Sequence, residues 1–166
     1  SVRKLTRVHA WDVAPASTER FAEAVRALGI ECIAETSPEA VARIADIIVT
    51  VTPSLKPIVM REWVRPGTHV SAMGADTRGK QELDPALLTG GRVFVDDLDQ
   101  ASESGEVNVP LHHGGLAKSH IAGTLGQVIA GRVPARLPGG ETTITVFDST
   151  GLAVQDVALA RVLLDA

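Results

Sequence analysis

The chain alternates between short strand signals and helix signals, and this alternation restricts its fold more than any other feature. The run Asp46–Val51 (DIIVTV) is the most apolar strand signal, and a strand that is apolar on both faces is typical of a parallel sheet covered by helices on both sides. Further strands are predicted at 5–11, 30–33, 70–73, 93–95 and 143–147. Helices are predicted at 17–28, 38–44, 85–88, 98–102, 121–130 and 152–164. The sequence therefore predicts an α/β fold with a doubly wound, mostly parallel sheet.

A carboxylate and an amine follow the strand signal at 70–73. The strand ends before Gly74, and Asp76 and Lys80 come shortly after it. The carboxyl ends of parallel strands are where open α/β sheets bind ligands. The alternative is an Asp in a glycine-bounded turn with a solvated Lys beside it. The position makes Asp76 a candidate for chemistry, with Lys80 as its neighbour.

Two other strand ends carry polar groups that suit a nucleotide. Asp12 follows the first strand signal and is placed like the carboxylate that hydrogen-bonds the ribose hydroxyls of a dinucleotide. A carboxylate there would repel a 2′-phosphate, so NAD is favoured over NADP. Thr52, Pro53 and Ser54 follow the most apolar strand, with hydroxyls that can donate to phosphate or ribose and a proline that stiffens the bend. A helix cap at Asp12 and an ordinary turn at 52–54 are the alternatives.

The glycine-rich turn that joins the first strand to the first helix of a dinucleotide-binding sheet is absent. Gly123-Thr124-Leu125-Gly126 has the wrong spacing and lies far along the chain. The first strand is central in the doubly wound order, so without it the strands at 5–11 and 46–51 would each lose a neighbour. Unpaired buried backbone groups cost about 1 to 3 kcal/mol each. We therefore expect an incomplete sheet that forms the carboxyl-terminal part of a longer enzyme.

Composition predicts one globular core and argues against several classes of protein. Of the 166 residues, 45% are apolar, and the net charge of −4 comes without a run of Lys and Arg, so nucleic-acid binding is not expected. The sequence has no apolar run long enough to cross a membrane and no secretory leader, which predicts a cytoplasmic protein that binds no membrane. Cys32, the single cysteine, is expected to be buried and inert.

The acidic and histidine pairs of the sequence do not predict a metal site. His112 and His113 would point to opposite faces of an extended strand, which is poor geometry for joint ligation. Asp96 and Asp97 come after a strand and could be read as a Mg²⁺ site, but acids before a helix are more often caps.

Five segments resemble the ornithine cyclodeaminase and mu-crystallin family in order and spacing. They are DIIVTVTPSLKPIV, EWVRPGTHVSAMGADTRGKQELDPALL, VFVDDLDQASESGEVNVPL, GQVIAGRVPAR and TITVFDSTGLAVQDVALA. The resemblance runs from about Leu5 to the last residue, and GADTRGKQEL together with VFDSTGLAVQD is specific. The family also includes an alanine dehydrogenase and ketimine reductases.

The resemblance implies a dimeric, two-domain oxidoreductase whose Rossmann domain holds NAD(H) or NADP(H). Residues 1–148 would be that domain without its first strand and glycine-rich loop. Residues 149–166 would form a helix that packs on an amino-terminal substrate and dimerisation domain, which would supply a Lys and an Arg for the substrate carboxylate. The apolar positions of this helix would lack a cover in the present chain: Val154, Val157, Ala158, Val162 and Leu163.

The resemblance also implies roles for residues at the strand ends. Asp76 matches the family's acid and base residue, and Lys80 matches a lysine at the nicotinamide side of the site. Asp12 matches the acid on the adenosine ribose. Glu106, after Gly105, matches the family's Gly-Glu dipeptide and is expected to hold a loop, with a contact near the substrate as the alternative. The other matches lie against the cofactor: Thr52, Pro53 and Ser54 in a turn over it, Met73 at a strand end, and Ser149 and Thr150 beside the nicotinamide.

The implied chemistry oxidises the Cα of an amino acid to an imine, with NAD as the hydride acceptor. Asp76 would take the proton from the amine and later deliver protons and water to the imine carbon. This requires that partial desolvation beneath the cofactor raises the pKa of Asp76 toward neutrality. Lys80 would hold Asp76 ionised, orient it or contact the cofactor. In a cyclodeaminase the imine loses ammonia, the distal amine closes a ring, and the retained hydride reduces the cyclic imine.

Three functions are open on this basis. The first is ornithine cyclodeamination, and the second is an alanine dehydrogenase or ketimine reductase reaction, in which the same hydride step is used once. The third is a mu-crystallin-like protein that binds a nucleotide or a small ligand. The carboxylate at Asp76 favours an enzyme, whose substrate would be a small amino or imino acid and whose homodimer would form through the missing domain.

Overall fold

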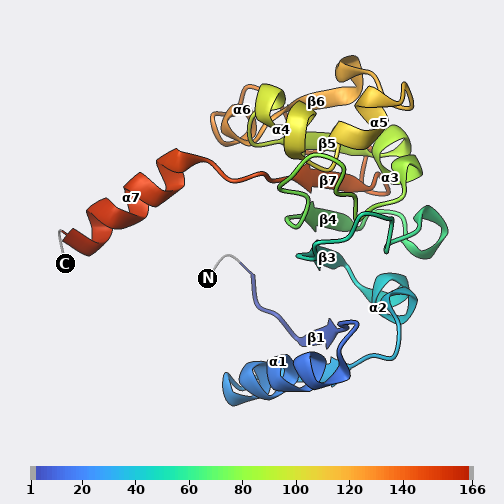
Figure 1. Ribbon diagram of the computed structural model, residues 1–166, viewed down its shortest axis with the longest axis vertical. Helices are drawn as coiled ribbons and strands as arrows, with labels where there is room; N and C mark the ends of the chain where they lie inside the picture. The colour runs from blue at the N-terminus through green and yellow to red at the C-terminus, as the bar shows by residue number, and fades with distance from the viewer. Residues whose placement is uncertain (1–2, 165–166) are drawn as a thin grey trace.

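The computed structural model describes residues 3–164, and its strands form two parallel sheets (Figure 1). The larger sheet contains, in spatial order, β3 (Ile47–Thr50), β4 (His69–Ala72), β7 (Thr145–Asp148), β5 (Arg92–Val95) and β6 (Ile121–Thr124). The smaller sheet pairs β1 (Arg7–Ala10) with β2 (Glu31–Ala34). All these pairs are parallel, which confirms the predicted α/β fold with a parallel sheet.

Helices join the strands, and several begin at capping residues that the sequence provides. They are α1 (Pro15–Ala27), α2 (Pro38–Ile44), α3 (Pro85–Gly90), α4 (Leu98–Ser104), α5 (Asn108–His112), α6 (Leu125–Ile129) and α7 (Ala153–Leu164), with 3-10 turns η1 (Arg61–Trp63) and η2 (Lys118–His120). The Ser37 hydroxyl accepts a hydrogen bond from the Ala40 N–H at the start of α2. Asp97 accepts one from the Gln100 N–H at the start of α4. Each side chain satisfies a backbone donor that the first helical turn leaves without a partner, so Asp97 is a helix cap as its position indicated.

The hydrophobic core lies on one face of the five-stranded sheet. Alternate strand residues point toward this face, where they meet side chains from α2, α3 and α4. The core includes Ala42, Ile48, Val70, Ala72, Leu83, Leu87, Leu88, Val93, Val95, Ala101 and Val146. The opposite face is less covered. It holds a pocket of about 520 Å³ lined by His69, Phe94 and Phe147 from the strands and by Leu125 and Val128 from α6.

The predictions for two segments were wrong in type. Residues 121–124, predicted to begin a helix, form β6, because their backbone pairs with β5 at the far end of the sheet. The helix starts only at Leu125, where Thr124 and Gln127 form a capping box. His112 ends the helix α5 instead of lying on an extended strand, and its Nδ1 lies 2.8 Å from the Asn108 carbonyl oxygen.

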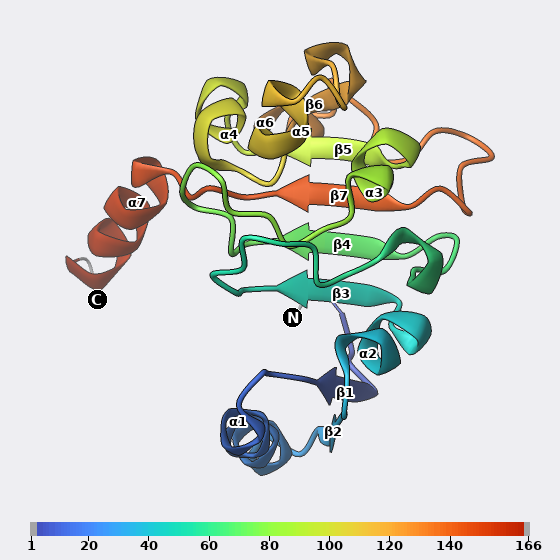
Figure 2. The ribbon, with the colours of Figure 1, turned by 45° about the vertical axis from the view of Figure 1, so that its right-hand side comes forward.

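The two sheets do not pair with each other in the described part of the chain. Figure 2 shows β1 and β2 set apart from β3, which is the last strand of the larger sheet. The prediction that the apolar strand 46–51 is covered on both faces was wrong for the described residues: Ile47 and Val49 alternate with the buried Ile48 and Thr50, and they are 47% and 59% exposed. The gap lies where a strand was expected between these two strands, and that additional strand stays a prediction.

The helix α7 stands away from the rest of the molecule (Figure 1). None of its described residues is buried, and Val154, Val157, Val162 and Leu163 are all more than 60% exposed. The prediction that its apolar side chains lack a cover in this chain is therefore confirmed. Within residues 3–164, no helix is both long enough and apolar enough to span a membrane.

Candidate active site

The register of the sheet brings the predicted residues to one edge. Thr50 of β3 pairs with Ala72 of β4, Ala72 pairs with Asp148 of β7, and Asp148 pairs with Val95 of β5. Since the strands are parallel, the residues that follow them all leave the sheet on the same side (Figure 2). We call this side the carboxyl edge, defined by residues 52–54, 73–80, 96 and 149–150.

Asp76 and Lys80 are hydrogen-bonded to each other at the carboxyl edge. The Lys80 Nζ donates to Asp76 Oδ1 at 2.5 Å, and the Thr77 hydroxyl donates to the same oxygen at 3.1 Å. The Asp76 side chain is 60% exposed. The hydrogen bonds from Lys80 and Thr77 hold the pKa of Asp76 below its usual range, and its exposure gives little opposing desolvation. The expected rise of this pKa is therefore not a property of residues 3–164 by themselves. The Lys80 contact favours the ionised form of Asp76, in keeping with one of the roles open to Lys80, and the choice among those roles stays a prediction.

Glu82 joins the ends of β3 and β4 from beneath the edge. Its fully buried carboxylate accepts hydrogen bonds from the Thr50 hydroxyl at 2.7 Å, from the Thr52 N–H and hydroxyl at 2.6 and 2.8 Å, and from the Gly74 N–H at 2.9 Å. A Cβ at Gly74 would collide with the Thr52 backbone and with the Glu82 carboxyl carbon. The two strand ends approach this closely only because residue 74 has no side chain.

Two residues at the start of α5 hold the segment that carries Asp76 and Lys80. The Glu106 carboxylate accepts from the Glu82 N–H at 3.0 Å and from the Leu83 N–H at 2.7 Å. The Asn108 Oδ1 accepts from the Gly79 N–H at 3.1 Å, and its Nδ2 donates to the Lys80 carbonyl at 3.3 Å. These contacts confirm the prediction that Glu106 holds a loop.

Asp96 holds the turn after β7. Its carboxylate accepts from the Ser149 and Thr150 hydroxyls and from the Thr150 and Gly151 N–H groups, at 2.7 to 3.2 Å. Asp96 is thus committed to fixing the predicted nicotinamide-side turn. Among residues 3–164, no group of three or more His, Cys, Asp or Glu side chains is arranged to bind a metal ion.

The other predicted cofactor residues also lie at strand ends. Thr52 donates its hydroxyl to Glu82, and the Ser54 hydroxyl donates to the Lys56 carbonyl at 2.6 Å, so both hydroxyls stabilise their own turn. Asp12 follows β1, where its exposed carboxylate accepts from the Ala14 N–H at 2.7 Å just before α1. Met73 is 42% exposed at the end of β4. Contacts of these residues with a cofactor stay predictions.

Two buried carboxyl groups lie behind the edge. Burial raises the pKa of Glu106 to about 8 and that of Asp148 to about 7, although backbone N–H groups that donate to them oppose the rise. Charge repulsion adds to both rises: Asp148 and Glu82 raise the pKa of Glu106, and Asp96 and Glu82 raise the pKa of Asp148. Asp148 accepts from the Val107 N–H through Oδ2, while its buried Oδ1 has no partner among the described residues.

These two pKa shifts predict that the protein becomes less stable as the pH rises. Below the unfolded-state pKa, about 4, both states hold the protons. Between that value and the folded-state pKa the unfolded chain releases them while the native state does not. Each carboxyl should then cost up to about 1.4 kcal/mol of unfolding free energy per pH unit. Urea midpoints of the full-length protein from pH 5 to 8 measure this slope.

The Glu106→Gln substitution should flatten the slope. The single atom Oε1 of Glu106 accepts hydrogen bonds from both the Glu82 and the Leu83 N–H groups, so the one side-chain oxygen of a glutamine can keep both bonds. Asp46→Asn, at an exposed residue on the opposite edge, provides the control and should leave the slope unchanged. A Glu106→Gln protein with the parent slope would contradict this pH dependence.

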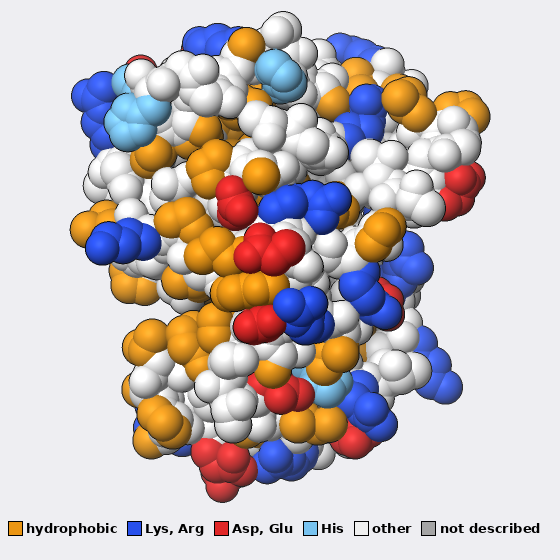
Figure 3. All heavy atoms as spheres, turned by 90° about the vertical axis from the view of Figure 1, so that its right-hand side faces the viewer, with side chains coloured by type: hydrophobic (Ala, Val, Ile, Leu, Met, Phe, Trp, Pro, Cys, Tyr) orange, Lys and Arg blue, Asp and Glu red, His pale blue; other side chains and the backbone are white. Residues whose placement is uncertain are grey.

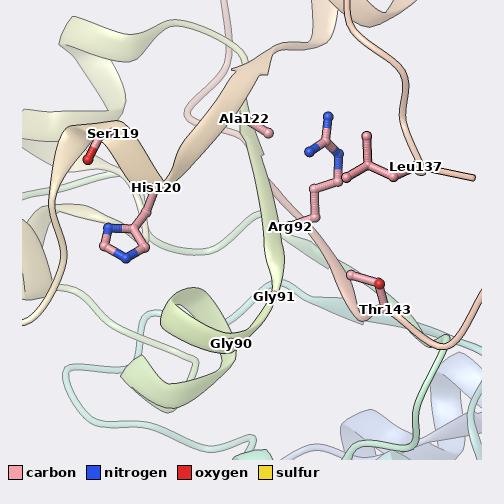
Figure 4. Close-up of a pocket in the computed structure, with 8 residues that line it drawn as sticks. All are labelled: Gly90, Gly91, Arg92, Ser119, His120, Ala122, Leu137 and Thr143. Atoms are coloured by element: carbon pink, nitrogen blue, oxygen red, sulfur yellow. The ribbon is translucent and has the colours of Figure 1, made fainter. Parts of the chain in front are cut away.

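A separate pocket lies at the amino-terminal ends of the strands. It has a volume of about 270 Å³ and is lined by residues that include Gly91, Arg92, Ser119, His120 and Thr143 (Figure 4). The Arg92 guanidinium donates to the Pro134 carbonyl. This pocket contains none of the predicted site residues. On the face seen in Figure 3, Lys and Arg side chains are mixed with Asp and Glu side chains and form no continuous basic stripe.

Sequence reasoning missed Glu82 and Asn108 and gave Asp96 no role at the site. The sequence holds only a weak signal for Glu82: it precedes the apolar Leu83, and an acid that is buried with such a neighbour needs hydrogen bonds, as Glu82 has in the structure. Asn108 is the only asparagine of the chain and lies between Val107 and Val109. A polar side chain in such an apolar stretch likewise indicates a residue that needs hydrogen-bond partners if it is buried.

Comparisons with known proteins agree with the fold described above. The model of the ornithine cyclodeaminase/mu-crystallin family matches residues 1–166. An alanine dehydrogenase from Archaeoglobus fulgidus is 45% identical over 94% of this chain and 47% of its own length. An iminosuccinate reductase from Paracoccus denitrificans is 38% identical over 99% of this chain and 50% of its own length.

A solved structure gives the same result for the fold. An archaeal alanine dehydrogenase dimer with bound NAD superposes with a TM-score of 0.91 and 42% identity, covering 96% of this chain and 49% of that one. The fold of residues 3–164 is therefore Rossmann-like, as the resemblance implied. The chain spans about half the length of the relatives it matches.

Proposed function

The chain belongs to the ornithine cyclodeaminase/mu-crystallin family, and from this membership we propose that it is the cofactor-binding part of an NAD-dependent oxidoreductase acting on amino or imino acids. The observation that carries the proposal is the Asp76–Lys80 pair at the carboxyl edge, held from below by buried side chains. An exposed pair fixed in this way suits a group that works on a ligand outside the sheet. The known activities of the relatives, alanine dehydrogenation and iminosuccinate reduction, support the same class of reaction.

The residues present fit the part of a dinucleotide that extends from the adenosine ribose to the nicotinamide. The exposed Asp12 carboxylate follows β1 and has oxygens that can accept from ribose hydroxyls. The turns at 52–54 and 149–151 are fixed by Glu82 and Asp96, as a surface that receives a large ligand requires. A Cβ at Gly74 has no room, and the absence of a side chain lets the backbone of residue 74 lie close against Thr52. Asp12 also favours NAD, because its charge would repel a 2′-phosphate.

The residues of this chain would handle the proton in the reaction. When bound, the nicotinamide ring supplies the acceptor or donor of the hydride. Asp76 is ionised at neutral pH, because the Lys80 and Thr77 hydrogen bonds lower its pKa, and it is therefore in the form that accepts a proton from a substrate amine. Lys80 donates to Oδ1, which leaves Oδ2 to take that proton. Coverage of the edge by a ligand and a second domain would raise the pKa of Asp76 by desolvation and make the carboxylate a stronger base.

Cyclodeamination is a second candidate, which the family itself supports. It uses the same hydride and proton steps and differs in the fate of the imine: a distal amine of the substrate would add to the imine carbon, ammonia would leave, and the retained hydride would return to the cyclic imine. Selection of the substrate side chain would depend on the domain that we expect outside this chain. That domain would also form the homodimer.

A panel of substrates tests the proposal on the full-length protein. We expect NADH to form from NAD⁺ with one amino acid among alanine, aspartate, proline, lysine and ornithine, or NADH to be consumed with the corresponding imino acid. Absorbance at the NADH maximum measures both directions, and NADP⁺ run in parallel tests the preference assigned to Asp12. Product formation from ornithine or lysine without net NADH would indicate cyclodeamination. Binding of NADH without turnover on any member of the panel would contradict an enzymatic function.

A further inference from the structure

The carboxamide of Asn108 lies between α5 and the segment that carries the candidate catalytic pair. Asn108 is 2% exposed at the first residue of α5. Its Oδ1 accepts from the Gly79 N–H, and its Nδ2 donates to the carbonyls of Lys80 and Gly105. One side chain therefore binds the backbone on both sides of the Gly79–Lys80 peptide link and fixes that link to the α4–α5 connection.

This arrangement bears directly on where the Lys80 ammonium lies. Gly79 has φ +87°, a conformation that favours glycine, and residues 76–79 are exposed. The Lys80 backbone is nevertheless fixed, because the Asn108 side chain is hydrogen-bonded to the Lys80 carbonyl and to the Gly79 N–H. From that fixed backbone the Lys80 Nζ reaches Asp76 Oδ1.

The contacts require a carboxamide. The Gly79 N–H needs an acceptor, while the Lys80 and Gly105 carbonyls need a donor, and an amide offers both on one planar group. A carboxylate at this position would keep the first bond and would place a buried negative charge against two carbonyl oxygens.

We propose that Asn108 is a positioning residue that holds Lys80 against Asp76 and thereby sets the protonation of that carboxylate. Its importance for turnover rests on the function proposed above, whereas its effect on the loop and on Asp76 does not. If Asn108 releases the backbone of residue 80, the ammonium spends less time on Asp76, and the pKa of Asp76 moves up toward that of an unpaired carboxyl.

The first test measures the unmodified full-length protein without cofactor. The Gly79 amide should be protected from hydrogen exchange by at least about tenfold relative to its exposed neighbours Thr77 and Arg78, because its acceptor is buried. A Gly79 amide that exchanges as fast as they do would overturn the proposal, and this measurement needs no variant to fold.

The second test compares Asn108→Asp and Asn108→Ser with the control Ser102→Ala. Ser102 is also buried, and the Ser102→Ala substitution removes one hydrogen bond, from the Ser102 hydroxyl to the Leu98 carbonyl. This bond lies within α4 and does not involve residues 76–81. Both Asn108 variants should raise amide exchange in residues 76–81 about tenfold, as expected for loss of one or two buried hydrogen bonds. They should also raise the pKa of Asp76 followed by carboxyl NMR, and should move the acidic limb of the kcat/KM profile to higher pH.

The control separates positioning from general destabilisation. Ser102→Ala should leave exchange in residues 76–81 and the pKa of Asp76 as they are in the parent protein. Folded Asn108 variants that resemble this control in both measurements would overturn the proposal. If the full-length protein shows no turnover on any substrate, the proposed function fails, and the exchange and NMR measurements still decide the role of Asn108.

Discussion

Replacing Asp76 by Asn is expected to abolish most of the turnover of the full-length protein while leaving NAD binding nearly unchanged. The amide keeps the size of the side chain but cannot accept a proton from a substrate amine. Loss of a general base typically lowers the rate by about 10² to 10⁴. The Asp76 side chain is exposed and is hydrogen-bonded only to the nearby Lys80 and Thr77 side chains in the described contacts, so the fold should tolerate the substitution. Steady-state kcat and the dissociation constant of NADH measure the two effects separately.

A matched substitution at another exposed aspartate provides the control for Asp76→Asn. Asp46 pairs with Arg65 at the opposite edge of the sheet, far along the chain from the candidate site. Asp46→Asn removes the same charge from the protein and should leave kcat unchanged. If Asp76→Asn kept near-normal turnover, the carboxylate would have to be withdrawn from the chemistry, and the proposed mechanism with it.

The second large effect is expected at Gly74, where an Ala side chain should strongly destabilise the protein. The added Cβ would overlap the backbone of Thr52 and lie 2.7 Å from the Glu82 carboxyl carbon. Backbone atoms at a strand end cannot move aside as a flexible side chain can, and the movement would also strain the four hydrogen bonds to Glu82. We expect a loss of at least about 3 kcal/mol, which for a domain of this size lowers Tm by roughly 6 to 12 °C.

Gly90 offers a control for the effect of adding a methyl group at a glycine. It ends α3, and a Cβ built there meets no atom within 4 Å. Gly90→Ala should be neutral, or stabilising by up to about 1 kcal/mol, since it reduces the freedom of the unfolded chain. Thermal unfolding of both variants measures the difference. Equal Tm values for the two would contradict a close approach of the Gly74 backbone to Thr52 and Glu82.

The class of fold and the position of the candidate site could be predicted from local patterns. A strand followed by glycine and then by Asp76 and Lys80 places both residues at a ligand-binding edge whatever the order of the strands. The capping role of Asp97 was also predictable from its position before a helix, whereas the loop-holding role of Glu106 came from the family resemblance. The fold class, the position of the site and the cap at Asp97 all depend on short stretches of sequence, so local patterns are enough to predict them.

The features that sequence reasoning missed depend on contacts between distant residues. Residues 121–124 became a strand because β5 offers them a partner, a fact that their own helical spacing does not contain. Glu82 and Asn108 acquire their roles from backbone groups of Gly74 and Gly79, which the fold brings within hydrogen-bonding distance. The expected rise in the pKa of Asp76 assumes a covering cofactor and stays a prediction, whereas the Lys80 and Thr77 hydrogen bonds, which need no ligand, lower that pKa.

The network beneath the carboxyl edge also has a consequence for how a ligand would arrive. Glu82, Asp96 and Asn108 immobilise the three turns from inside the protein, so a docking molecule does not have to freeze them and loses little affinity to ordering entropy. Binding of a ligand at the carboxyl edge should therefore need little rearrangement of the protein. Any gating movement must then originate in a segment that this network does not anchor, such as the outlying helix α7.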